Sequence, residues 1–118
     1  MEPMQAERIP SNVQEIPGQE EETLKNARDR LSEASYRVGL HYYRVRWYPG
    51  AIDRFREVLR DDPEYTGRDA VYFYLAESLA RTDKTPEAIP YFERLLQEFP
   101  ASEHVEDVKV RLQALKNQ

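Results

Sequence analysis

The feature that most constrains the fold of this chain is a phrase that occurs twice, at an offset of 37 residues. The first copy, Ala51 to Pro63, reads AIDRFREVLRDDP, and the second, Ala88 to Pro100, reads AIPYFERLLQEFP. The shared apolar positions lie mostly three or four residues apart, which is the spacing of one face of an α-helix. A helical unit that returns after such a period predicts an α-solenoid, in which each unit stacks only on its neighbours.

Helical periodicity continues on both sides of these two phrases. We expect helices over about residues 21–45, 49–62, 69–81, 85–98 and 103–116. Pro49 and Pro86 suit the first position of a helix, and Thr85 suits the N-cap before Pro86. The first helix is unusually long and carries one continuous apolar stripe, made of Leu24, Ala27, Leu31, Ala34, Val38, Tyr42 and Val45. Sustained strand alternation is not found, so the fold class is predicted to be all-α, with a long first helix and a C-terminal capping helix.

Residues 1–19 differ in composition from the rest of the chain. They carry Pro3, Pro10, Pro17 and Gly18 and few apolar side chains. Such a segment does not bury enough apolar surface to offset the entropy of ordering it. The predicted organisation is therefore an extended or disordered arm over 1–19, followed by a helical domain over 20–118.

The repeated phrases, together with the helices before them, resemble the tetratricopeptide repeat (TPR). Written on its 34-residue pattern, 32–65 forms one repeat and 69–102 a second, with a capping helix at about 103–116. The resemblance places Gly39 against Ala51, and Ala76 against Ala88, where the two helices of each repeat cross. Two residues depart from the pattern: Ser35 stands where the family prefers tryptophan, and Pro90 lies inside a helix.

A narrower resemblance covers about residues 29–116. The phrases VGLHYYRVRWYPGAIDRFREVLRDDPEY and LAESLARTDKTPEAIPYFERLLQEFPASEHVED are similar to those of the BamD/YfiO family of outer-membrane assembly lipoproteins. The family is periplasmic, carries a lipid on a cysteine and has five repeats rather than two. The resemblance implies a scaffold of the bacterial cell envelope. The alternative is a cytoplasmic or self-assembling TPR adaptor with no envelope role.

Residues that support catalysis or cofactor binding are scarce. The chain has no cysteine, which excludes thiolate chemistry and cysteine-bound zinc. His41 and His104 lie far apart, and neither has a metal-ligand partner one helical turn away other than acidic residues. The acidic residues near His104, and the cluster Asp61, Asp62 and Glu64, are interpreted as solvated surface. Neither a glycine-rich phosphate loop nor a catalytic constellation is found. The prediction is a non-enzymatic protein without cofactor or metal, and without a membrane-spanning segment.

The TPR resemblance also implies a binding face. In TPR proteins the first helix of each repeat lines a concave groove, and a ligand meets fixed positions of the repeat. Carried over to this sequence, those positions are Glu33, Tyr36, Leu40, Tyr43 and Arg44, then Ala70, Phe73, Glu77, Ala80 and Arg81. Aromatic anchors beside arginines suit a protein or peptide partner that carries carboxylates. The alternative is that these aromatic residues are covered by a preceding repeat or by the N-terminal arm.

The first turns of the long helix pose a separate question. Residues 21–31 are expected to extend past the bundle, which leaves the stripe at Leu24, Ala27 and Leu31 without a neighbour. We predict self-association or partner binding through this part of the helix.

Charge distribution offers a nucleic-acid alternative. The net charge is −5, but residues 25–60 carry a net charge of +5. Arg37, Arg44, Arg46, Arg54, Arg56 and Arg60 alternate there with aromatic residues. On helical geometry these arginines point in several directions, and acidic segments flank them on both sides. The pattern therefore favours a protein partner over a nucleic acid.

Overall fold

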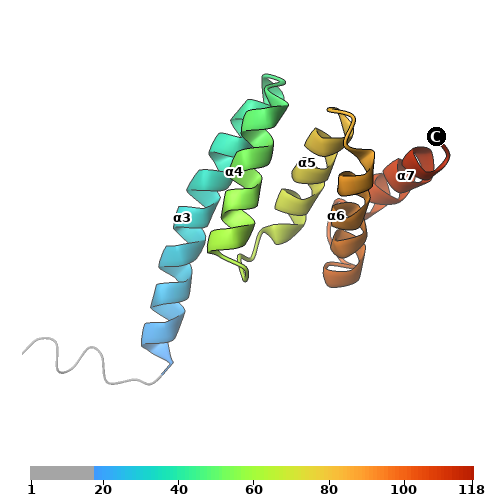
Figure 1. The fold of residues 1–118 in the computed structure, drawn as a ribbon. Coiled ribbons are helices and arrows are strands. Elements are labelled where there is room, and N and C mark those ends of the chain that lie inside the picture. Colours follow the sequence, from blue (N-terminus) through green and yellow to red (C-terminus); the bar gives the residue numbers. More distant parts are fainter. Residues whose placement is uncertain (1–17) are drawn as a thin grey trace, which may run out of the picture.

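The computed structural model describes residues 18–118, and all regular structure in that range is helical (Figure 1). Its five helices succeed one another in the order of the chain and stack side by side. They are α3 (Gln19–Arg44), α4 (Tyr48–Asp61), α5 (Arg68–Ala80), α6 (Thr85–Glu98) and α7 (Val105–Lys116). The predicted α-solenoid with a long first helix and a capping helix is confirmed.

The helix ends differ from the sequence prediction by one or two residues in most places. α3 begins at Gln19, the last residue of the predicted arm, Gly18 is its N-cap, and residues 1–17 of that arm lie outside the described residues. The prediction of Thr85 as an N-cap is wrong, because Thr85 is the first helical residue and Lys84 precedes it without a side-chain cap bond. Pro90 lies within α6, which continues through it to Glu98.

The first hairpin closes where α3 crosses α4. Gly39 is buried, and a Cβ added to it would lie 2.6 Å from a ring carbon of Phe55. Phe55 itself is fully buried, as is Ala51 one turn before it. Glycine at this position of α3 therefore lets the phenylalanine ring of α4 lie directly against the helix backbone.

The second hairpin, α5 with α6, holds the centre of the core. α5 packs against both α4 and α6, and α7 covers the far side of α6. The central helix is accordingly buried on most of its circumference. Its fully buried apolar residues, together with those of α6, are Val71, Leu75, Ala76, Leu79, Ala88, Phe92 and Leu95.

α7 continues the repeat rather than merely closing it. Val108 and Leu112 follow Val71 and Leu75 at the same offset of 37 residues, and both are buried, at 0% and 8% exposure. α7 is thus the first helix of a third unit, and its inward residues are those that the repeat predicts.

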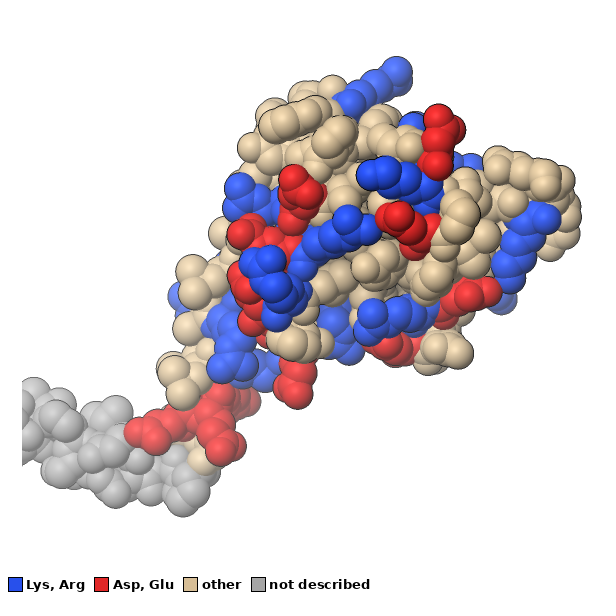
Figure 2. Space-filling view, viewed as in Figure 1, with Lys and Arg blue, Asp and Glu red and all other residues tan. Residues whose placement is uncertain are grey.

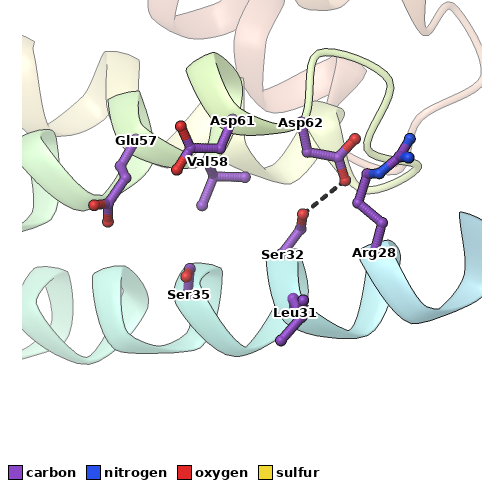
Figure 3. A pocket seen from close by; sticks show the side chains of 8 residues that line it. All are labelled: Arg28, Leu31, Ser32, Ser35, Glu57, Val58, Asp61 and Asp62. Carbon is purple, nitrogen blue, oxygen red and sulfur yellow. Dashed lines mark hydrogen bonds between the residues drawn. The ribbon is translucent and has the colours of Figure 1, made fainter. Parts of the chain in front are cut away.

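Hydrogen bonds between side chains fasten the loops to the helices. Ser32 of α3 donates to the carboxylate of Asp62, just after α4, over 2.6 Å (Figure 3). In the second unit the roles are exchanged, since Ser102 donates to the carboxylate of Asp69 over 2.6 Å. Each bond ties the first helix of a unit to the residues that follow its second helix.

Most of the apolar stripe of α3 does not face the core, and only Tyr42 packs against it. Leu24, Leu31, Val38 and Val45 are 62%, 73%, 37% and 57% exposed. The face of α3 that meets its neighbours is instead made of small and aromatic residues, among them Ser32, Gly39 and Tyr36. The reason is position: α3 is the first described helix of the stack, so its neighbours lie on one side of it only (Figure 1).

Among the described helices, none combines the length and the apolar composition that crossing a bilayer requires.

We predict that Gly39→Ala destabilises the fold by about 1–2 kcal/mol. Overpacking a core costs about 1–3 kcal/mol, which exceeds the gain of up to about 1 kcal/mol from replacing glycine within a helix. Urea unfolding followed by circular dichroism measures the difference. In a Phe55→Leu background the cost of Gly39→Ala should shrink. An equal cost in both backgrounds would show that the crossing does not depend on this contact.

Candidate protein-binding face

Aromatic side chains connect α3, α4 and α5 on one face of the stack. The ring of Tyr43 on α3 lies 5.0 Å from that of Tyr74 on α5 and 5.8 Å from that of Tyr48 at the start of α4. Tyr36, two turns earlier on α3, lies 6.4 Å from Tyr74 and 5.9 Å from Phe55. Tyr36, Tyr43, Tyr48 and Tyr74 are all half-buried, so each ring is held by its neighbours while part of it reaches solvent.

The same face continues from α5 towards α7. Phe73 lies 5.0 Å from Tyr74 in an edge contact and stacks on His104 at 4.6 Å, with 13° between the ring planes. His104 directly precedes α7, and its side chain is 13% exposed. We call Tyr48, Tyr43, Tyr74, Phe73 and His104 the aromatic row. It connects α3, α4 and α5 to the residue that precedes α7, and each ring in it contacts the next.

A buried carboxylate lies beside the row. Glu77 is 4% exposed. It accepts hydrogen bonds from Arg111 over 2.7 and 3.2 Å and from Arg81 over 3.3 Å. Arg81 also lies over the ring of Tyr43 at 5.9 Å and donates to the hydroxyl of Tyr48 over 3.5 Å. Two guanidinium groups thus share one carboxylate, which leaves this part of the face with a net positive charge.

Burial sets the protonation of the tyrosines. Desolvation raises the pKa of Tyr36 well above its usual range, with a further contribution from Tyr74. Desolvation also raises the pKa of Tyr43, although the positive charge of Arg81 opposes the shift. Both hydroxyl groups therefore remain neutral at physiological pH and can donate a hydrogen bond to a partner.

The structure brings several of the sequence-predicted site residues together. Tyr36 and Tyr43 meet through Tyr74, and Tyr43 meets Arg81 and, through it, Glu77. Phe73 joins the same face through its contact with Tyr74.

Other predicted residues stand apart from the row. Glu33 is paired with Arg37 over 2.7 Å on the exposed side of α3. Leu40 is half-buried, and Arg44 is exposed at the end of α3. Leu24, Ala27 and Leu31 are exposed on the stripe described above.

Glu77, which the TPR pattern places among the ligand-facing positions, does not present its side chain to solvent. Its side chain is inside the structure, and its carboxylate is already paired with Arg81 and Arg111. Burying a carboxylate requires such pairing, because an unpaired charge in the interior is strongly destabilising. Glu77 thus holds the guanidinium groups of Arg81 and Arg111 in place.

Sequence reasoning missed Tyr48, Tyr74, His104 and Arg111. Tyr74 lies next to Phe73, at a repeat position that the TPR pattern does not assign to ligands. Arg111 had a usable signal: it follows Tyr74 by the repeat offset of 37, which places it on the same face of the next unit. For His104, no sequence signal predicted the stack on Phe73.

Four of the six arginines that suggested nucleic acid are paired with carboxylates. Arg37, Arg54, Arg56 and Arg60 each lie within 3.4 Å of a glutamate or aspartate oxygen. Figure 2 shows the same mixture, with basic and acidic side chains interspersed over the visible face of the helices. This arrangement does not form a continuous phosphate track of the kind that non-specific nucleic-acid binding uses.

A shallow recess of about 250 Å³ lies between α3 and the end of α4, away from the aromatic row. Figure 3 shows its lining, with Leu31 pointing away from α4. Polar and charged groups line it on the α4 side, where Asp62 is already bonded to Ser32. Among residues 18–118, histidine and acidic side chains form no group of three or more that could hold a metal ion.

Comparison with known proteins bears on the second unit. Residues 70–102, which include most of α5, all of α6 and the turn after it, match the family model of the tetratricopeptide repeat. No curated protein matches the chain. The family match supports a TPR protein, and TPR domains generally mediate interactions between proteins.

We predict that Glu77→Gln destabilises the fold by about 1–2 kcal/mol, because hydrogen bonds to a charged group contribute about 1.5–3 kcal/mol and glutamine keeps only part of them. The matched control is Glu93→Gln, since Glu93 pairs with Lys116 over 2.9 Å where both side chains are about half exposed. That change should cost less than about 0.5 kcal/mol. Chemical unfolding of both variants measures the contrast, and equal losses would contradict it.

Proposed function

We propose that this chain is a TPR-type protein-interaction scaffold that binds a segment of another protein on the aromatic row. The domain that carries the row corresponds to residues 20–118. The observation that carries the proposal is the row itself. Half-buried rings that are fixed by mutual contacts offer apolar area to a partner at a low cost in conformational entropy. Tyrosine and arginine side chains of this kind are enriched in binding hot spots.

The charges beside the row indicate the chemistry of the partner. Arg81 and Arg111 flank the row with only Glu77 to balance them, and Arg44 adds an exposed cation at the end of α3. Guanidinium groups pair well with carboxylates, often through two hydrogen bonds. We therefore expect an extended or helical segment that combines an aromatic or aliphatic side chain with aspartate, glutamate or a chain terminus.

Selection of random peptides on the purified chain tests this function. The selected peptides should be enriched in apolar residues next to carboxylates. Tyr43→Ala should weaken their binding roughly 30-fold, the effect of losing a hot spot of about 2 kcal/mol. Arg44→Ala should weaken it less, since Arg44 is exposed.

Two controls make the result interpretable. Arg60→Ala removes an exposed arginine from α4, away from the row, and should leave peptide binding unchanged. Helicity measured by circular dichroism should be the same in all three variants. Peptides that bind the Tyr43→Ala variant as well as the unmodified chain would assign the row to the core and refute the proposal.

We further propose that the scaffold acts in the cell envelope. What supports this is the resemblance of residues 29–116 to the outer-membrane assembly lipoproteins, in particular the tyrosine- and arginine-rich end of α3 that leads into α4. The alternative, a cytoplasmic adaptor, needs no lipid anchor. The two differ in a simple observation: an envelope lipoprotein gene encodes a signal sequence with a lipid-bearing cysteine before the helical domain.

We expect the gene to encode that signal upstream of Met1, and metabolic labelling with a fatty acid to mark the protein in its own cell. A reading frame that begins at Met1, together with a protein that takes up no lipid, would favour the cytoplasmic adaptor.

A further inference from the structure

The exposed apolar residues of α3 follow a strict spacing. Leu24, Leu31, Val38 and Val45 are seven residues apart, three on α3 and the last at its C-cap. They account for four of the six large apolar side chains that are exposed in residues 18–118. Scattered apolar residues on a surface need no explanation, but a row with one fixed period does.

Alanines complete the pattern. Ala27 and Ala34 follow Leu24 and Leu31 by three residues, and both are exposed. Apolar residues that alternate at spacings of three and four give an average period of 3.5, which keeps one seam of a helix facing a partner helix. Leu24 to Val45 spans three heptads, the length at which such a pattern indicates a coiled coil. We call these six residues the α3 seam.

The internal repeat shows that this side of a first helix is built to be covered. Ala34, Val38 and Tyr42 of α3 correspond, at the offset of 37, to Val71, Leu75 and Leu79 of α5. Those three residues of α5 are fully buried, because α5 has helices on both sides of it. On α3, Ala34 and Val38 are exposed on the corresponding side, and only Tyr42 packs against a neighbour, with its ring 4.7 Å from that of Trp47.

From this geometry we propose that the α3 seam pairs with the α3 seam of a second copy of this chain, with the two helices antiparallel. The seam lies on the opposite side of α3 from Tyr36 and Tyr43. The pairing is therefore separate from the peptide-binding function proposed above, and either can hold without the other.

Side-chain size favours the antiparallel orientation. In an antiparallel pair, the two central large residues of each seam face alanines of the other helix, while Leu24 faces His41 and Val45 faces Glu20. Leu31 then lies opposite Ala34 of the second copy, and Val38 lies opposite Ala27 of the second copy. The pairing is symmetric, so every contact occurs twice, as in the commonest class of homodimer. A parallel pair would instead stack alanine on alanine and leave gaps between the helices.

Charge at the helix ends favours the same orientation. The first turn of α3 holds Glu20, Glu21 and Glu22, and its last turn holds His41 and Arg44. Acidic side chains are visible at the lower end of α3 in Figure 2, beside the grey segment. An antiparallel pair places each acidic end beside a basic end and also opposes the two helix dipoles. A parallel pair would bring six glutamates together.

One like-charge contact remains in the antiparallel pair. In the register that places Leu31 opposite Ala34, Arg30 approaches Arg37 of the second copy. The pairing of Arg37 with Glu33 over 2.7 Å offsets much of this repulsion.

The length of α3 sets the size of the interface. A helix of 26 residues is about 39 Å long. A pair of that length buries about 1,000–1,200 Å², near the lower limit for specific interfaces. We therefore expect a reversible dimer in the micromolar range.

Sedimentation equilibrium of the full chain tests whether a second copy of this chain binds the α3 seam. The mass should rise from 14.0 kDa towards twice that value as the concentration rises over about two orders of magnitude. Leu31→Glu should abolish the rise. The control is Val110→Glu, because Val110 is equally exposed, at 70%, on α7. A monomer at every concentration, or a Leu31→Glu variant that still dimerises, would overturn the proposal and assign the seam to another protein.

Disulfide crosslinking between introduced cysteines tests the orientation of the two helices. Because the chain has no natural cysteine, any disulfide must join the introduced residues. In the antiparallel pair, position 24 lies opposite position 41 of the second copy. Leu24→Cys and His41→Cys should each fail to form a disulfide dimer alone and should form one when mixed. A disulfide dimer of the Leu24→Cys variant alone would show parallel pairing and overturn the antiparallel arrangement. Circular dichroism of each variant confirms that the fold is intact.

Discussion

The contact between Gly39 and Phe55 determines how the first two helices meet, and the rest of the structure depends on that meeting. Because Gly39 has no side chain, the ring of Phe55 lies against the backbone of α3. The same ring also contacts Tyr36, which in turn contacts Tyr74 of the next unit. The core of one hairpin is thereby connected to the surface that it shares with its neighbour. A larger residue at position 39 would move α4 and with it the first half of the aromatic row.

A helix inside a solenoid has neighbouring helices on two sides. The helices of this chain differ in how many of their sides are covered by a neighbour. α5 has neighbours on both sides and has no exposed residue, and the charged residue Glu77 is among those that are buried. α3 has neighbours on one side only, so most of its apolar stripe remains exposed. Both helices are the first helix of a repeat. The difference in their burial therefore comes from their place in the stack rather than from their sequence pattern.

This contrast also explains what sequence could and could not predict. The helices, the repeat and the crossing at Gly39 follow from residue spacing, because a period of 3.6 and a small residue are local properties. The burial of Glu77 is not local, since it depends on Arg111, which lies 34 residues away in a different helix. The length of the first helix predicted that Leu24, Ala27 and Leu31 lack a neighbour, but the exposure of Val38 was out of reach of periodicity, which detects an apolar face but not whether a neighbour covers it. The place of Tyr74 in the row is not a local property either, because it depends on contacts of its ring with Tyr36 and Tyr43 of the preceding unit.

α3 therefore carries two rows of side chains with the same seven-residue spacing, one that faces α5 and one that faces away from it. Tyr36 and Tyr43 are seven residues apart and face α5, whereas Leu24, Leu31 and Val38 are seven apart and face away from it. Pairing through the outward row leaves the inward row open, so a dimer of this kind presents two binding faces on one particle. A partner that carries two copies of its recognition segment then binds with an effective concentration set by the spacing of the faces, and avidity can exceed the single-site affinity by about 10²–10⁴. A solenoid of only a few units has a small binding surface, and duplication by symmetry is a physical means of enlarging it without adding repeats.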